Sequence, residues 1–209
     1  ASPEKVVFVT DHEVVYGSPA AAARGARIRE IARCWRIGRF YDVGQGGHGH
    51  LFPLEQGWIK PGMFLFAYDM HCTNFGAIGA AAYGVGPEIT SVLATGTLWT
   101  QVPDTICVRL HGKLAPGVHA RDVGFVLAHG FSSDRWGVSA DYRVVEFAGP
   151  GLAGLSIADR VALCNSITEI GVANVAFPPP AGSKEGVHSD PGADYLHVID
   201  LDLSEITAQ

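Results

Sequence analysis

The densest group of side chains able to do chemistry lies in residues 68–76, which include Asp69, His71 and Cys72. These residues follow an apolar run at residues 63–67 that predicts a buried strand. Ligands of open α/β sheets bind at the carboxyl ends of strands, so an acid, an imidazole and a thiol at this point indicate a functional site. The alternative is structural, because Asp, His and Thr after a strand also close turns and cap helices.

Three further places carry groups suited to acid–base chemistry or metal binding. They are Asp11 with His12, His48 with His50 in a glycine-rich loop, and Asn165 with Glu169. The first two follow predicted strands, and parallel strands end at a common edge of their sheet, so these groups can converge with Asp69 and His71. The last two are four residues apart on a predicted helix and share a face. Such a cluster suits general acid–base work or metal binding.

Each of these groups also has a structural explanation. An Asp-His pair after a strand can cap the next helix, Glu169 suits a solvated helix face, and Asn165 can bond to backbone. His48 fits a solvent-facing loop position. Cys164 is typical of a core cysteine.

Alternating strand and helix signals predict an α/β fold with a largely parallel or mixed sheet. We expect a single domain over residues 1–209, with an exposed loop at 178–194. Strands are predicted at 6–9, 40–43, 63–67, 106–110, 142–147, 172–177 and 195–200, and helices at 20–36, 88–99, 121–129 and 157–170.

Composition excludes several classes of partner. The net charge is −6 and Lys/Arg clusters are absent, which argues against nucleic acid as a partner. No apolar run approaches 20 residues, so no membrane span is expected. Hydrophobic residues make up 47% of the chain and charged residues 17%, which suggests that another chain covers some surface. The four cysteines are scattered, with no C-x-x-C pair, and we expect reduced thiols in a cytoplasmic protein.

Taken together, the motifs resemble the aconitase and 3-isopropylmalate dehydratase large-subunit family, in the family's order and at about its spacing. The matching segments are Val9-Thr10-Asp11-His12, Leu54-Glu55-Gln56-Gly57, Lys60-Pro61-Gly62-Met63, Asp69-Met70-His71-Cys72-Thr73, Gly76-Ala77-Ile78-Gly79-Ala80, Leu93-Ala94-Thr95-Gly96-Thr97-Leu98-Trp99, Gly112-Lys113-Leu114-Ala115-Pro116-Gly117-Val118 and Leu163-Cys164-Asn165-Ser166-Ile167-Thr168-Glu169-Ile170-Gly171. The resemblance implies a three-layer α/β/α domain whose site lies at the carboxyl ends of its strands.

The family's enzymes dehydrate and rehydrate hydroxy-dicarboxylic or tricarboxylic acids with a [4Fe–4S] cluster as Lewis acid. The resemblance implies that the Asp11–His12 pair supports the leaving hydroxyl and that His50 lies near cluster and substrate. It implies that Asp69 and His71 orient the proton network. The remaining roles are helix residues beside the cluster for Asn165 and Glu169, and substrate contacts for Met70, Cys72 and Thr73.

The departures from the family pattern are also informative. The family usually has Asp-Ser-His-Thr where this chain has Asp69-Met70-His71-Cys72. The family's cluster cysteines and its arginine-rich, carboxylate-binding segments lie downstream of the matched region and have no counterpart here. A [4Fe–4S] cluster is therefore expected only if a partner or further segment supplies cysteines; otherwise the expectation is no cofactor or one divalent metal, with His50, His71 and Cys72 as candidate ligands.

Three hypotheses follow. The preferred one is a hydro-lyase or isomerase-type dehydratase domain or subunit that acts on a small polycarboxylic or hydroxy acid, with further domains or a second protein chain completing its site. The second is a cluster-free relative that acts as an isomerase or cyclase by acid–base chemistry or with a mononuclear metal. The third is a non-catalytic assembly module on an enzyme-derived scaffold.

Overall fold

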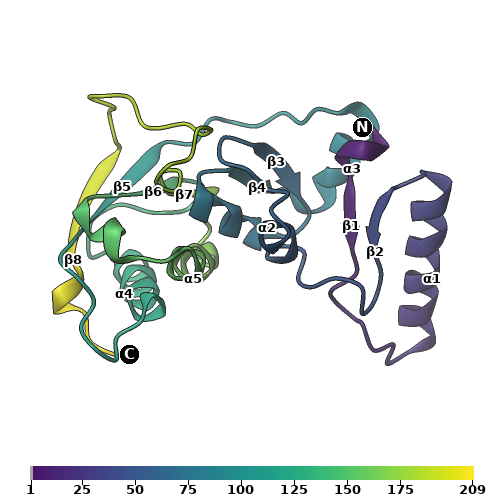
Figure 1. The fold of residues 1–209 in the computed structure, drawn as a ribbon, viewed down its shortest axis with the longest axis horizontal. Helices are drawn as coiled ribbons and strands as arrows, with labels where there is room; N and C mark the ends of the chain where they lie inside the picture. The colour runs from purple at the N-terminus through teal and green to yellow at the C-terminus, as the bar shows by residue number, and fades with distance from the viewer. Residues whose placement is uncertain (1) are drawn as a thin grey trace.

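A computed structural model describes residues 2–209, and its strands form three separate parallel sheets. At one end of an elongated molecule, β1 (Val7–Val9) pairs with β2 (Arg39–Tyr41), and α1 (Pro19–Cys34) connects them (Figure 1). This helix begins as the sequence predicts, since the Ser18 hydroxyl accepts a hydrogen bond from the Ala21 N–H and Pro19 occupies the first turn. A short 3₁₀ helix, η1 (Pro3–Lys5), precedes β1.

The middle of the molecule is a two-stranded sheet of β3 (Phe64–Ala67) and β4 (Ala81–Gly84). A nine-residue 3₁₀ helix, η2 (Met70–Ile78), connects the two strands, and the short helix α2 (Phe52–Glu55) precedes them. The prediction that residues 63–67 form a strand is confirmed, but the prediction that this strand is buried is wrong. Phe64 is 61% exposed, because a sheet of only two strands leaves one face partly open.

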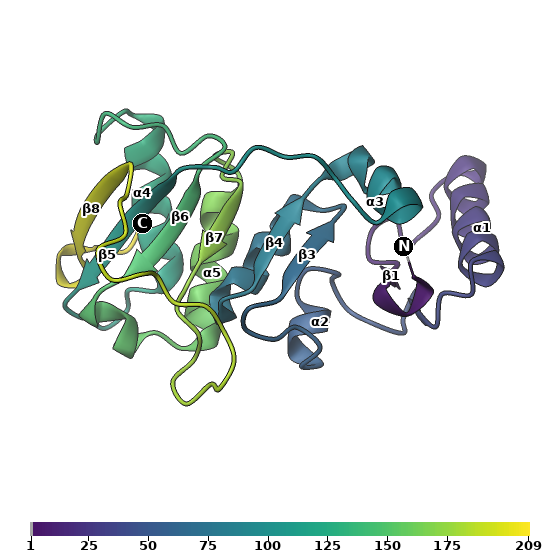
Figure 2. The same cartoon turned by 90° about the horizontal axis from the view of Figure 1, so that it is seen from above.

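The far end is a four-stranded parallel sheet in the order β7-β6-β5-β8. Its elements are β5 (Thr105–His111), β6 (Val144–Ala148), β7 (Asn174–Ala176) and β8 (His197–Asp202), with α4 (Ala120–Ser132), α5 (Ile157–Thr168), η4 (Pro150–Gly154) and η5 (Leu203–Glu205). Both α4 and α5 lie on one face of this sheet (Figures 1 and 2). Alternate β5 residues, Ile106, Val108 and Leu110, are fully buried in the main core that these helices help to enclose.

The loop before β8 runs along the other face of the four-stranded sheet (Figures 1 and 2). It is attached there because the Ser189 and Tyr195 hydroxyls both donate to the Glu146 carboxylate. The α/β class with parallel sheets is confirmed, and among the described residues α4 and α5 supply the helical layer of this sheet. Residues 181–194 are exposed, whereas Pro179 is buried, so the exposed loop begins later than residue 178.

Most predicted elements are present, with shifted ends. The helix predicted at 88–99 is shorter, since η3 (Gly86–Glu88) leads into α3 (Ile89–Thr95) and Gly96 ends it with a left-handed φ of 78°. The small residues at 76–82 allow close packing of backbones. A Cβ on Gly76 would lie only 1.7 Å from the Val175 carbonyl oxygen of β7, so η2 approaches the large sheet backbone to backbone.

Candidate active site

His71 is held between two carboxylates that come from different parts of the fold. Asp69 follows β3 and caps η2, where its Oδ1 accepts hydrogen bonds from the His71 backbone N–H at 2.7 Å and lies 3.0 Å from His71 Nδ1. The other ring nitrogen, Nε2, lies 2.9 Å from Oε1 of Glu169, the residue that ends α5. The imidazole is therefore oriented at both nitrogens, as acid–base groups in active sites commonly are.

A second histidine–carboxylate pair follows β1. Asp11 Oδ1 lies 2.7 Å from His12 Nδ1, and Asp11 Oδ2 accepts a 2.6 Å hydrogen bond from the Gly49 N–H. Gly49 belongs to the glycine-rich loop after β2, so this carboxylate ties the ends of two neighbouring strands together. A Cβ on Gly49 would lie 3.2 Å from Asp11 Oδ2, which explains why the smallest residue stands there.

Four imidazoles form a continuous row between these two pairs. The ring centroids of His12 and His48 are 6.3 Å apart, those of His48 and His50 are 5.2 Å apart and stacked, and those of His50 and His71 are 5.3 Å apart. His50 is also bonded to the buried Asn74, whose amide nitrogen lies 3.1 Å from His50 Nδ1. The loop after β2 thus connects the Asp11–His12 pair to the Asp69–His71–Glu169 group.

These contacts shift the pKa values of His12 and His50 in opposite directions. Hydrogen bonding and charge attraction from Asp11 raise the pKa of His12, so this exposed ring favours the protonated form. Burial lowers the pKa of His50, and the neighbouring imidazoles lower it further, so this ring favours the neutral form. One row thus contains a proton donor and a neutral hydrogen-bonding ring.

The two aspartates stay ionised. Burial alone would raise the pKa of Asp11 and of Asp69, but hydrogen bonds outweigh it and lower both. For Asp11 the bonds come from Gly49 and His12, and for Asp69 from the backbone and ring of His71. Both aspartates are therefore available as fixed negative charges that orient imidazoles.

The remaining predicted site residues lie around this cluster. Asn165 is half-buried one turn before Glu169 on α5 and takes no part in the cluster's hydrogen bonds in the described residues. Met70 is partly exposed beside His71. Cys72 and Thr73 are buried beneath the cluster, where the Thr73 hydroxyl bonds to the Thr168 hydroxyl at 2.6 Å.

The structure thus brings six predicted residues together, namely Asp11, His12, His50, Asp69, His71 and Glu169. Sequence reasoning missed one further contributor, Asn74. It placed His48 beside His50 but favoured a solvent-facing position, and His48 is indeed exposed while its ring stacks on His50. The stacking of His48 on its neighbour two residues later was not foreseeable from the letters of a glycine-rich loop. Asn74 had one available signal, an amide within a run of small and apolar residues, and this signal was not used.

Some of these side chains are of the types that bind metal ions or clusters. Within residues 2–209, the side chains close enough to share an ion are His50, Asp69 and His71, whose ligand atoms lie within 4.8 Å of one another. Cys72 is not among them, and burial raises the pKa of its thiol to about 12. Iron–sulfur clusters are held by cysteine thiolates. The described residues therefore do not fit a [4Fe–4S] cluster by themselves.

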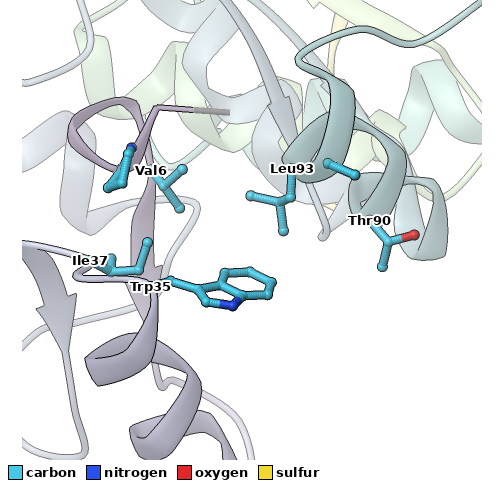
Figure 3. Close-up of a pocket in the computed structure, with 7 residues that line it drawn as sticks. Val6, Trp35, Ile37, Thr90 and Leu93 are labelled. Carbon is cyan, nitrogen blue, oxygen red and sulfur yellow. The ribbon is translucent and has the colours of Figure 1, made fainter.

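Two cavities lie away from the histidine row. One, of about 350 Å³, is lined mostly by apolar residues, including Val6 just before β1, Trp35 at the end of α1 and Leu93 of α3 (Figure 3). The other, of about 240 Å³, lies where Phe66 and Tyr83 of the middle sheet face Tyr142. Neither contains the histidine–carboxylate groups, and the row itself lies at an open surface, with the His12 side chain 69% exposed.

The fold and the site define a class. This is an α/β domain of parallel sheets that brings paired histidines and carboxylates together, a combination suited to general acid–base chemistry. No helix among residues 2–209 is both long enough and apolar enough to cross a membrane.

Comparison with known proteins then gives the family. The aconitase family (aconitate hydratase) matches residues 9–185, and this chain belongs to that family. The chain is 33% identical, over 219 residues, to a 3-isopropylmalate dehydratase large subunit from Methanopyrus kandleri, with 99% of the chain and 51% of the relative covered.

Two further relatives agree with this match. The 3-isopropylmalate dehydratase large subunit of Moorella thermoacetica is 34% identical over 220 residues, covering 99% of this chain and 51% of the relative. A probable methanogen homoaconitase large subunit from Methanosarcina mazei is 33% identical over 220 residues, covering 99% and 55%. The chain thus spans about half the length of these curated relatives.

Proposed function

We propose that this chain is the acid–base part of a hydro-lyase, a dehydratase domain or subunit that acts on a small polycarboxylic or hydroxy acid. The observation that carries the proposal is the His71 imidazole between Asp69 and Glu169, joined through His50 and His48 to the Asp11–His12 pair. Family membership and the dehydratase and homoaconitase names of the relatives support the same class of reaction.

Dehydration of a hydroxy acid breaks a C–H bond next to a carboxylate and a C–O bond to the hydroxyl, and it releases water. We assign protonation of the leaving hydroxyl to His12, because Asp11 raises its pKa and its ring is exposed at the open end of the row. The proton released from carbon requires a base, and we propose that the further protein that completes the site supplies it.

We assign the other cluster residues to holding the His71 ring and contacting the substrate. Asp69 and Glu169 contact the His71 ring at its two nitrogens, which holds the orientation of the ring toward the substrate. Met70, Cys72 and Thr73 belong to the same segment, with Met70 the one exposed enough to touch a substrate directly. Asn165 is proposed to contribute from the next turn of α5 once the rest of the site is in place.

A partner is part of the proposal. Among the described residues, no arginine or lysine bonds to the cluster, although a polycarboxylate substrate requires cations. The cysteines also do not fit a cluster. We therefore propose that further domains or a second chain supply the carboxylate-binding cations and any [4Fe–4S] cluster; the relatives' description as large subunits is consistent with this.

The test is a pair of matched histidine substitutions in the native complex. Dehydration of hydroxy di- and tricarboxylic acids is followed by the ultraviolet absorbance of the unsaturated product. His12→Gln should lower kcat by about 10²–10⁴-fold, the usual contribution of one general acid. His188→Gln, in the exposed 181–194 loop, should leave kcat unchanged. Equal kcat for His12→Gln and the unsubstituted protein would remove His12 from this role.

A further inference from the structure

The strongest unassigned feature of the site is the buried amide of Asn74. This side chain is fully buried within η2. Its nitrogen lies 3.1 Å from Nδ1 of His50 and 3.4 Å from the carbonyl oxygen of the same residue. Its own oxygen, Oδ1, is buried and has no hydrogen-bond partner among residues 2–209. A buried amide with one unsatisfied atom is costly, so its orientation matters.

The backbone carbonyl decides which way the amide points. A carbonyl oxygen only accepts hydrogen bonds, so the end of Asn74 that faces both it and Nδ1 of His50 must be the NH₂ group. The reverse orientation would place two oxygens 3.4 Å apart and would bury the NH₂ group without a partner instead. The amide nitrogen therefore donates to Nδ1 of His50.

We infer that Asn74 is a positioning residue that holds His50 in the tautomer with its proton on Nε2. A ring whose Nδ1 accepts a hydrogen bond carries its single proton on Nε2 when neutral. His50 thus presents an N–H to the histidine row and to any bound substrate, and it donates to a hydroxyl or carboxylate oxygen.

This arrangement has a consequence for metal binding by the same side chains. Coordination through Nε2 needs its lone pair, which moves the ring proton to Nδ1. That proton would then face the NH₂ group of Asn74, donor against donor. Asn74 therefore disfavours a mononuclear ion on His50, Asp69 and His71, although their ligand atoms lie within 4.8 Å of one another. The role of His50 toward substrate rests on the proposed function, whereas its tautomer does not.

The tautomer can be measured without substrate or partner. The full chain is labelled with ¹⁵N-histidine, and long-range ¹H–¹⁵N correlation spectra are recorded in mildly alkaline buffer. His50→Gln identifies the His50 signals by their loss. We expect His50 to show an unprotonated Nδ1 and a protonated Nε2. A protonated Nδ1 would overturn the inference.

Two substitutions at Asn74 and a matched control complete the test. Asn74→Asp replaces the donor with an acceptor and should move the His50 ring proton to Nδ1. Asn74→Ala removes the donor without burying a charge, so it keeps the test possible if Asn74→Asp does not fold, and it should give a mixture of His50 tautomers. Asn174→Asp alters another buried asparagine with an unpartnered oxygen, in β7, and should leave His50 unchanged. A protonated Nε2 alone in Asn74→Ala would show that Asn74 does not set the tautomer. Because no activity is measured, failure of this inference is distinguishable from failure of the proposed function.

Discussion

At the scale of single residues, the site depends on how each imidazole is fixed. His71 Nδ1 hydrogen-bonds to Asp69 at 3.0 Å, and Nε2 lies 2.9 Å from Glu169, a contact that is an ion pair when the ring carries two protons. Loss of one proton therefore frees one carboxylate contact. A ring placed in this way can pass a proton while its orientation is still held by the remaining bond.

The Asp11–His12 pair gives a prediction for pH dependence. Asp11→Asn should lower the pKa of His12 toward its usual range, because it removes the negative charge and replaces the carboxylate with a weaker, neutral hydrogen-bond acceptor. A ¹H NMR titration of the His12 ring measures this directly. Asp194→Asn, in the exposed 181–194 loop, is the control and should not move His12. An unchanged His12 titration in Asp11→Asn would show that the two side chains are not paired in solution.

The same pair should stabilise the fold only within a window of pH. His12 has a raised pKa in the folded chain, so its contribution is present below its unfolded pKa and is lost as pH rises through the folded value. Asp11 has a lowered pKa, so its contribution is present above its unfolded value and is lost as pH falls through the folded one. The unsubstituted chain should have a higher free energy of unfolding at mildly acidic pH than at alkaline pH because of the His12 contribution. Asp11→Asn should make this difference in unfolding free energy smaller.

At the scale of elements, η2 connects the site to the large sheet. It begins at the cap formed by Asp69 and carries His71 and Asn74. Its buried Thr73 hydroxyl donates to Thr168, whose own hydroxyl donates to the Cys164 carbonyl of α5. These bonds, together with the backbone contact at Gly76, fix the position of η2 against α5 and β7.

Gly76→Ala tests this connection. Its Cβ would lie 1.7 Å from the Val175 carbonyl oxygen, so η2 must move away from β7, and overpacking of this kind costs about 1–3 kcal/mol or more of unfolding free energy. The free energy is measured by urea denaturation. Gly38→Ala is the matched control, since its Cβ would meet nothing within 4 Å, and it should be neutral or slightly stabilising. Equal stability of the two variants would contradict the packing described for η2.

Element positions were largely predictable from sequence, whereas their grouping into sheets was not. The helices predicted from residues 20 and 157 are α1 and α5, whose starts are marked by Ser18 and Ser156. Both hydroxyls accept backbone N–H groups in the first turn. The strand β4 was missed because Ala81–Gly84 has little apolar or β-branched signal; its pairing with β3 is non-local.

For the site, residues that directly follow strands were predictable from the sequence, whereas contacts between distant loops were not. Side chains directly after strands, such as Asp11 and Asp69, were identified because strand ends are local features. These side chains converge, but not at one sheet edge as expected, because β1 and β3 belong to different sheets. Contacts made by Asn74 and His48 depend on loop packing across many residues, which sequence spacing does not encode.

At the scale of the whole molecule, this chain presents an open and one-sided acid–base surface. It covers about half the length of its curated relatives. Among the described residues, no arginine or lysine bonds to the histidine row, and no cysteine belongs to the group of side chains close enough to share an ion. Large apolar side chains are exposed nearby, including Met70 beside the cluster and Tyr68 just before it. These features agree with a site that further protein closes.

The most direct test of this account is the composition of the native complex that contains the chain. Native mass spectrometry is combined with iron and acid-labile sulfide analysis and with the dehydration assay. The account predicts an active assembly larger than the 22.1 kDa chain, with iron and sulfide bound by protein outside these 209 residues. A 22.1 kDa monomer that dehydrates hydroxy acids without iron or sulfide would contradict it.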